Sequence, residues 1–284
     1  MKLSKETIRI GLEKPFKVLH ISDTHLTCAD ERDDERKRAL AEARHASFAA
    51  KGCGEMEAVL EQIAYANEHC DLLLHTGDLL DFVSYANIDT GRELLSRCKD
   101  FFMISGNHEF SRYVGEAWED TAYKMSSYQQ LRNGLGFDLL YLSRVFGGVN
   151  FVGIDNGYYN VEPWQLQRLQ KEVEKGLPIV LCMHTPIFEE GLYAFSMNKH
   201  KHACAYLLGC DEEHLAEFTE YRAVQQRPTP ETLRFIDYVL SQPLIKCVLA
   251  GHLHLPYTSA LPGGLMQYVA GAGYKGYACE FTFV

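Results

Sequence analysis

Residues 17–25 read KVLHISDTH, an apolar run that ends on Asp23 and His25. Apolar and β-branched residues bounded by polar ones predict a buried strand over 17–22. In extended backbone, side chains two positions apart project to the same side, so Asp23 and His25 are expected to face one metal ion. A single motif of this kind is weak evidence, because a lone histidine after a strand is more often a structural residue.

An apolar run followed by polar residues recurs four more times along the chain. The polar residues read Thr76-Gly-Asp78, Ser105-Gly-Asn-His-Glu109, Met183-His184 and Ala250-Gly-His-Leu-His254. Open α/β sheets form their ligand sites at the carboxyl ends of strands. We therefore expect all five segments to converge on one cleft.

The remaining pattern alternates strands with helices. Strands are predicted over residues 17–22, 71–76, 101–105, 150–155, 178–183, 246–250, 264–270 and 277–283. Apolar residues at helical spacing predict helices over 56–68 and 232–240. The Gly147-Gly148 pair predicts a hairpin turn. This alternation indicates a mixed α/β fold.

Length and composition indicate one folded unit. The chain has 284 residues, of which 46% are hydrophobic and 23% charged, and this excludes disordered, collagen-like and coiled-coil classes. No repeat or linker divides the sequence, so a single domain is expected over 1–284. Segments at about 28–54 and 189–230 resemble insertions that form a cap. The charges of residues 30–44 are expected on a solvated helix with i,i+4 pairs.

The charge balance bears on partners. Lys and Arg number 28 against 38 Asp and Glu, a net charge of -10, which disfavours nucleic acid and anionic membranes as partners. The sequence has no apolar run of membrane-spanning length and no secretory leader pattern, so a cytoplasmic location is expected. Nine cysteines without a CxxC pair are interpreted as reduced thiols.

The ordered motifs resemble those of the calcineurin-like metallophosphoesterases, and their pattern is closest to the bacterial cyclic nucleotide phosphodiesterase branch. The resemblance rests on Asp23-x-His25, Gly77-Asp78, Gly106-Asn-His-Glu109, His184 and Gly251-His-x-His254. It runs from about residue 17 to about residue 257. It implies a four-layer α/β/β/α sandwich of two mixed β-sheets flanked by helices.

The resemblance also implies two divalent transition metal ions bridged by Asp78. One ion would be completed by Asp23, His25 and His254, and the other by Asn107, His184 and His252. Two cations need a carboxylate between them, and a water that they share loses a proton near neutral pH. Carboxylate, amide and imidazole ligands suit Mn, Fe or Zn, and the sequence leaves the choice open.

The resemblance makes His108 the expected catalytic residue, which donates a proton or hydrogen bond to the substrate. Asp81 is its expected partner, and a solvent-facing turn residue is the alternative interpretation. Glu109 is expected to bind loop amides, and His75 to be a hydrogen-bonded core histidine. Weaker candidates for substrate contact, each weighed against an ordinary loop residue, are Asn156, Tyr158, Tyr159, His200, Lys201 and His202.

The implied reaction is hydrolysis of a phosphoester by a metal-activated water. Protein serine/threonine phosphatases carry an arginine where this chain has Phe82, which argues against a phosphoprotein and favours a small phosphodiester or nucleotide. A DNA exonuclease and a phosphomonoesterase are the alternative enzymes. A scaffold without activity is a further alternative, disfavoured because every motif residue is present.

Overall fold

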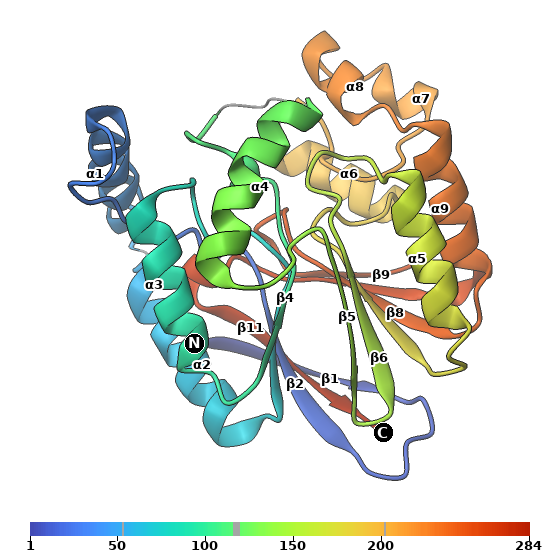
Figure 1. The fold of residues 1–284 in the computed structure, drawn as a ribbon. Coiled ribbons are helices and arrows are strands. Elements are labelled where there is room, and N and C mark those ends of the chain that lie inside the picture. Colours follow the sequence, from blue (N-terminus) through green and yellow to red (C-terminus); the bar gives the residue numbers. More distant parts are fainter. Residues whose placement is uncertain (53, 116–119, 202) are drawn as a thin grey trace.

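Two β-sheets packed face to face form the centre of the protein (Figure 1). The computed structural model describes residues 1–52, 54–115, 120–201 and 203–284. The first sheet contains, in spatial order, β1 (Lys2–Ile8), β11 (Tyr277–Phe283), β2 (Phe16–Ile21), β3 (Leu72–His75) and β4 (Phe101–Met103). The second contains β5 (Tyr141–Phe146), β6 (Val149–Ile154), β7 (Ile179–Cys182), β8 (Ile245–Ala250), β10 (Met266–Val269) and β9 (Tyr257–Ala260). Both sheets mix parallel and antiparallel pairs.

Helices cover the outer faces of both sheets. The first sheet is covered by α2 (Glu55–His69), α3 (Tyr85–Ser96) and α4 (Thr121–Leu135), and the second by α5 (Pro163–Val173) and α9 (Pro230–Ser241) (Figure 1). Strand β2 shows why, since Val18 packs between the sheets whereas Leu19 and Ile21 pack toward the helices. The expected four-layer α/β/β/α sandwich of two mixed sheets is confirmed.

The predicted elements are found, and three strands were missed. All eight predicted strands, both predicted helices and the Gly147-Gly148 hairpin are present, with Gly147 at φ 57° and Gly148 at φ 83°. The missed strands are β1, β5 and β9. Strand β1 reads KLSKETI and is mostly exposed at a sheet edge, so it lacks the apolar signal of a buried strand.

The two segments interpreted as insertions differ from each other in how many of their residues are buried. Residues 28–54 carry α1 (Glu35–Ala49), whose only buried residues are Ala41 and Phe48. The ion pairs of this segment include contacts from Arg32 to Asp89 and from Arg44 to Asp81, so they reach other elements as well as near neighbours. Residues 189–230 form α6 (Glu190–Lys199), α7 (Glu212–Leu215) and α8 (Glu220–Gln226), which share a small hydrophobic cluster. Cys53 and His202 lie outside the described residues.

Three short 3-10 turns complete the described structure. They are η1 (His108–Phe110), η2 (Pro262–Gly264) and η3 (Gly273–Lys275). The eight cysteines in the described ranges are free thiols. None of the helices in the described ranges is long and apolar enough to cross a bilayer.

Candidate metal centre

The polar segments after β2, β3, β4, β7 and β8 meet at one edge of the two sheets. They bring six candidate ligands into two groups that share Asp78. The first group is Asp23, His25, Asp78 and His254, and the second is Asp78, His184 and His252. Asn107 lines the cleft beside them. The predicted convergence of the five segments is therefore observed.

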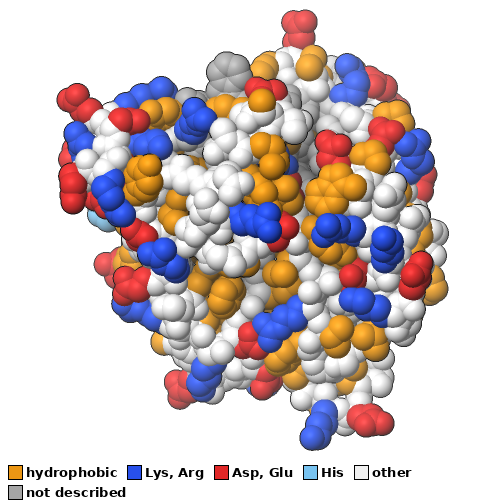
Figure 2. Space-filling view, in the orientation of Figure 1, with side chains coloured by type: hydrophobic (Ala, Val, Ile, Leu, Met, Phe, Trp, Pro, Cys, Tyr) orange, Lys and Arg blue, Asp and Glu red, His pale blue; other side chains and the backbone are white. Residues whose placement is uncertain are grey.

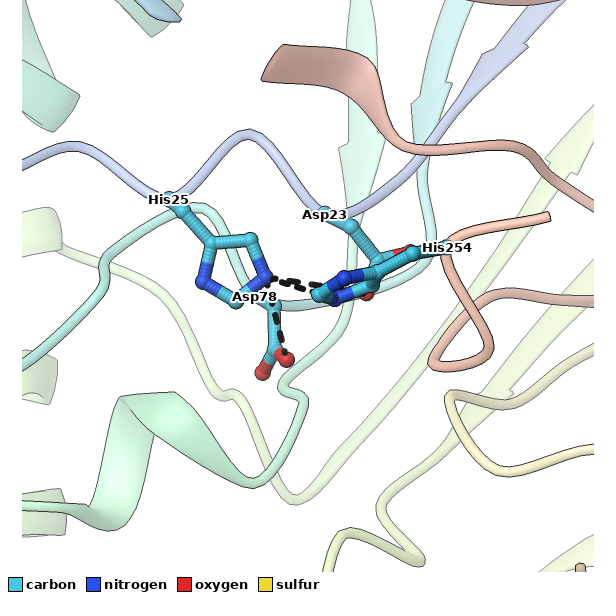
Figure 3. Close-up of side chains that lie close together, drawn as sticks. All are labelled: Asp23, His25, Asp78 and His254. Atoms are coloured by element: carbon cyan, nitrogen blue, oxygen red, sulfur yellow. Dashed lines mark hydrogen bonds and ion pairs between the residues drawn. The ribbon is translucent and has the colours of Figure 1, made fainter. Parts of the chain in front are cut away.

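The ligand atoms of the first group all lie within 4.8 Å of one another. Figure 3 shows His25 joined by dashed contacts to His254 and Asp78. The Nε2 atoms of His25 and His254 lie 3.0 Å apart, and His254 Nε2 lies 3.3 Å from an oxygen of Asp23. An oxygen of Asp78 lies 3.8 Å from His25 Nε2. Two ligands at right angles, each about 2.1 Å from an ion, are about 3 Å apart, so these spacings fit one cation.

The second group presents the same spacing around the other side of Asp78. The Oδ2 atom of Asp78, the oxygen that faces His25, lies 3.2 Å from His184 Nε2. His252 presents Nδ1, which is 3.1 Å from His184 Nε2. The Oδ1 atom of Asn107 is buried and has no hydrogen-bond partner among the described residues. An unpaired buried oxygen beside two imidazole nitrogens fits a cation, which would satisfy it.

The backbone that carries these ligands is left-handed at five positions. Asp23, His25, Asp78, His252 and His254 have φ between 53° and 72°. The expectation that Asp23 and His25 project to one side because their backbone is extended is therefore wrong. Asp23 and His25 enter one ligand group, whereas His252 and His254 enter different groups. Left-handed backbone costs on the order of 1 kcal/mol or more per residue and is concentrated at functional sites.

Two glycines allow the loops to approach one another. A Cβ atom on Gly106 would lie 2.2 Å from an Asp78 carboxylate oxygen. A Cβ atom on Gly251 would lie 1.9 Å from the hydroxyl oxygen of Ser22. Both contacts are too short for any side chain, which explains why glycine precedes Asn107 and His252.

Hydrogen bonds to the second ring nitrogen fix each histidine. His25 Nδ1 donates to Asp81 at 3.0 Å, and His184 Nδ1 donates to the Thr76 carbonyl at 2.7 Å. His252 Nε2 contacts the Tyr159 hydroxyl at 3.0 Å. These partners turn the remaining nitrogen of each ring toward the ligand groups and set its tautomer.

The charge of the centre is balanced by its own imidazoles. Burial would raise the pKa of Asp78, but His184 and His108 hold it well below its ordinary value. Burial would lower the pKa of His184, but the Asp78 carboxylate raises it to about 10. The buried carboxylates thus require nearby positive charge, which a divalent cation would also supply.

His108 lies beside Asp78, and its contact with Asp81 differs from the expected one. The His108 Nδ1–H donates to the backbone carbonyl of Asp81 at 2.7 Å, whereas the Asp81 carboxylate lies 3.6 Å away. That carboxylate binds His25 and Arg44 instead, at 3.0 and 2.6 Å. Asp81 is fully buried, so the solvent-facing alternative is wrong. Burial would lower the pKa of His108, but Asp78 and Asp81 raise it.

Glu109 ties the loops after β3 and β4 together. Its carboxylate accepts hydrogen bonds from the backbone N–H groups of Asp78, Leu80 and Gly106, at 2.9, 3.1 and 2.6 Å. Burial, and then the charge of Asp78, raise its pKa to about 7. The predicted amide-binding role of Glu109 is confirmed.

The other predicted residues either hold the core and loops together or line the cleft. His75 is a core histidine that contacts the Thr24 hydroxyl at 2.9 Å, as expected. Asn156 accepts from the backbone N–H groups of His184 and Thr185 and so holds the loop after β7. Tyr158, Tyr159 and His200 line the cleft. Lys201 has a left-handed backbone, and His202 lies outside the described residues.

Sequence reasoning missed three residues near the centre. Arg44 reaches Asp81 from α1, and the ring of Phe48, one turn later, packs tilted against that of Tyr274 at 4.7 Å between centroids. The Tyr274 hydroxyl lies 3.4 Å from His254 Nδ1. A buried Phe48 within a charged helix was the available signal for α1. Tyr274 lies in the glycine-rich stretch 271–276, and η3 is held there by hydrogen bonds from the Gly273 and Tyr274 N–H groups to the Ser22 and Asp23 carbonyls.

Comparison with known proteins agrees with this geometry. A family model described as calcineurin-like phosphoesterase matches residues 16–256. No curated protein matches the chain. A dimetal phosphatase from Danio rerio superposes with a TM-score of 0.51 at 14% identity, covering 93% of this chain and 91% of that one.

The purple acid phosphatase PPD1 from yellow lupin gives a TM-score of 0.52 at 14% identity, covering 93% of this chain and 45% of that protein. This chain therefore spans less than half of the lupin protein. At such identities the likeness concerns the fold, whereas the family match extends through all five polar segments. The chain belongs to the calcineurin-like phosphoesterase family and is a hydrolase acting on phosphoesters.

Proposed function

We propose that this protein hydrolyses a small phosphodiester or nucleotide with two divalent cations bound at the centre. The observation that carries the proposal is the position of Asp78, whose carboxylate belongs to both ligand groups. Asp23, His25 and His254 would complete the shell of one cation. Asn107, His184 and His252 would complete the other.

The residues of the chain suit this chemistry. Bound divalent cations would acidify a water and offset the charge that develops on the phosphoryl oxygens. His108 would donate a proton to the leaving group through Nε2, because Nδ1 is engaged by the Asp81 carbonyl. Asp81 is a positioning residue for both His25 and His108.

The donor set supports Mn, Fe or Zn as the cations. All seven proposed ligands offer oxygen or imidazole nitrogen, and none of them is a thiolate. Carboxylate and amide oxygens alone would favour Mg²⁺ or Ca²⁺, whereas the four imidazoles favour transition metals.

Two observations support a small diester over other phosphoesters. At the position where protein phosphatases place arginine, this chain has the uncharged and buried Phe82, which offers no cation to a phosphate dianion. Lys and Arg side chains are interspersed with Asp and Glu on the face drawn in Figure 2, rather than gathered in the strip that a nucleic acid backbone needs.

The test is hydrolysis of bis-p-nitrophenyl phosphate and p-nitrophenyl phosphate by Mn²⁺-loaded protein. The proposal predicts metal-dependent turnover that prefers the diester and is lost in Asp78→Asn. Asp237→Asn, at an exposed position on α9, is the matched control and is expected to behave as wild type. Preference for the monoester would overturn the diester assignment. Absence of metal-dependent activity on both esters would count against the hydrolytic proposal as a whole.

A further inference from the structure

A cleft of about 350 Å³ lies against the candidate metal centre, and its far wall comes from residues 189–230. Asp78, His252 and His254 line it on the metal side. His200, Tyr206, Arg222 and Gln225 line it from the 189–230 segment. The hydrolytic reaction uses none of these last four residues, so their presence in the cleft needs another explanation.

Arg222 is the residue that gives this wall its chemistry. Among the described residues that line the cleft, it is the only lysine or arginine. Its guanidinium donates through Nη1 to the Gln225 amide oxygen at 2.5 Å and lies over the ring of Tyr206, 5.2 Å from the centroid. In the described part of the chain, no carboxylate pairs with it. Its positive charge is held in place by neutral partners and remains available to an anion.

Tyr206 fixes the distance between Arg222 and the metal centre. Its ring centroid lies 5.8 Å from that of His252, and its backbone is left-handed at φ 58°. The Arg222 guanidinium lies 5.2 Å from the same Tyr206 centroid. The guanidinium and the centroid of the His252 ring are therefore at most 11 Å apart. A small molecule can span that interval.

His200 provides a second polar group on the same wall. Its ring packs edge-on against Tyr206 at 4.7 Å between centroids. The Nε2 atom is buried and has no hydrogen-bond partner among the described residues. His200 and Arg222 thus pack on the same tyrosine ring, and an unpaired buried nitrogen there is typical of a site that a ligand completes.

We propose that Arg222 and His200 bind a second anionic group, a phosphate or carboxylate, on the part of the substrate that is not attacked. This inference rests on the proposed hydrolysis at the metal centre and specifies its substrate as a molecule with two anionic groups. Guanidinium groups bind phosphate and carboxylate in a forked geometry, and Arg222 keeps donors beyond the one used by Gln225.

The test compares adenosine 5′-monophosphate with adenosine 3′,5′-bisphosphate as competitors of chromogenic ester hydrolysis. Both nucleotides reach the metal centre through one phosphate, so the ratio of their inhibition constants isolates the second anion. We expect wild type to bind the bisphosphate more tightly. Arg222→Gln should reduce that preference about tenfold or more, the effect of one charge-assisted hydrogen bond. Arg222→Lys should retain part of it.

Arg227→Gln is the matched control. Arg227 follows α8 on the same segment, pairs with Glu212 and does not line the cleft, so the preference should remain. An unchanged preference in Arg222→Gln, or equal binding of both nucleotides to wild type, would overturn the inference. If wild type hydrolyses neither chromogenic ester, the hydrolytic proposal fails separately. Calorimetric titration of the Mn²⁺-loaded protein with the same nucleotides then tests the Arg222 site alone.

Discussion

Replacement of Glu109 by glutamine should weaken both metal binding and the fold. The carboxylate accepts three buried backbone N–H groups, two at Oε2 and one at Oε1. A glutamine oxygen can replace Oε2, but its NH₂ group then faces the N–H of Leu80. One buried donor loses its acceptor, which costs about 1–3 kcal/mol of unfolding free energy.

The effect on the metal follows because the lost hydrogen bond, from the Leu80 N–H, belongs to the same loop as the ligand Asp78, two residues away. Asp78 is the shared ligand, and Gly106 precedes Asn107, so Glu109 joins two of the loops that supply ligands to the second cation. Loss of a hydrogen bond that orients a ligand lowers metal affinity about 10–100-fold. Glu109→Gln should therefore raise the Mn²⁺ dissociation constant within this range.

The assay is calorimetric titration of EDTA-treated protein with Mn²⁺, paired with urea unfolding in EDTA. Glu280→Gln is the matched control, because Glu280 is also buried but binds Tyr65 and Lys17, away from the centre. It should lower the unfolding free energy and leave the Mn²⁺ affinity unchanged. Equal Mn²⁺ affinity in wild type and Glu109→Gln would refute the role assigned to this carboxylate.

Three further outcomes are expected. His108→Ala should retain its metal content but lose about 10²–10⁴-fold in kcat, and an unchanged kcat would exclude His108 as the proton donor. Gly106→Ala should lose metal, measured by elemental analysis, because its Cβ would meet Asp78 at 2.2 Å; full metal content would contradict this. Burial, and then the nearby His75, lower the pKa of His20 to about 3. Protons therefore bind the unfolded chain preferentially as the pH falls below about 6.5. Between pH 7 and pH 5, the unfolding free energy of the metal-free wild-type protein should fall by about 2 kcal/mol more than that of the metal-free His20→Gln variant. Equal losses in both proteins would show that His20 does not titrate in this way.

The sequence predicts the buried strands and the set of candidate ligands because both depend on local pattern. Apolar runs such as residues 17–22 must be buried wherever they lie, and polar residues after them must lie at strand ends. Strand β1 was missed because it lies at an exposed edge of the sheet and contains mostly polar and charged residues. Edge strands need few apolar residues, so their pattern is weak.

Contacts between distant segments could not be predicted in the same way. Arg44 and Tyr274 reach the centre from a charged helix and from a glycine-rich turn. The sequence around each residue does not indicate that it contacts Asp81 or His254. The Asp81 carboxylate was assigned to His108 by position in the motif, but the backbone turns its carbonyl to that ring and its side chain to His25. Which group contacts which histidine depends on the conformation of the loops, and several residues of these loops have left-handed backbone.

The order of strands in the first sheet constrains how the chain can fold during synthesis. Strand β11 lies between β1 and β2, so β1 pairs with a strand made much later and has no other neighbour in the described part of the sheet. A growing chain must hold β1 without a partner until residues 277–283 have left the ribosome. Tyr274, which contacts His254, is made at the same late stage. The first sheet and the surroundings of His254 are thus completed only after residues 274–283 have been translated.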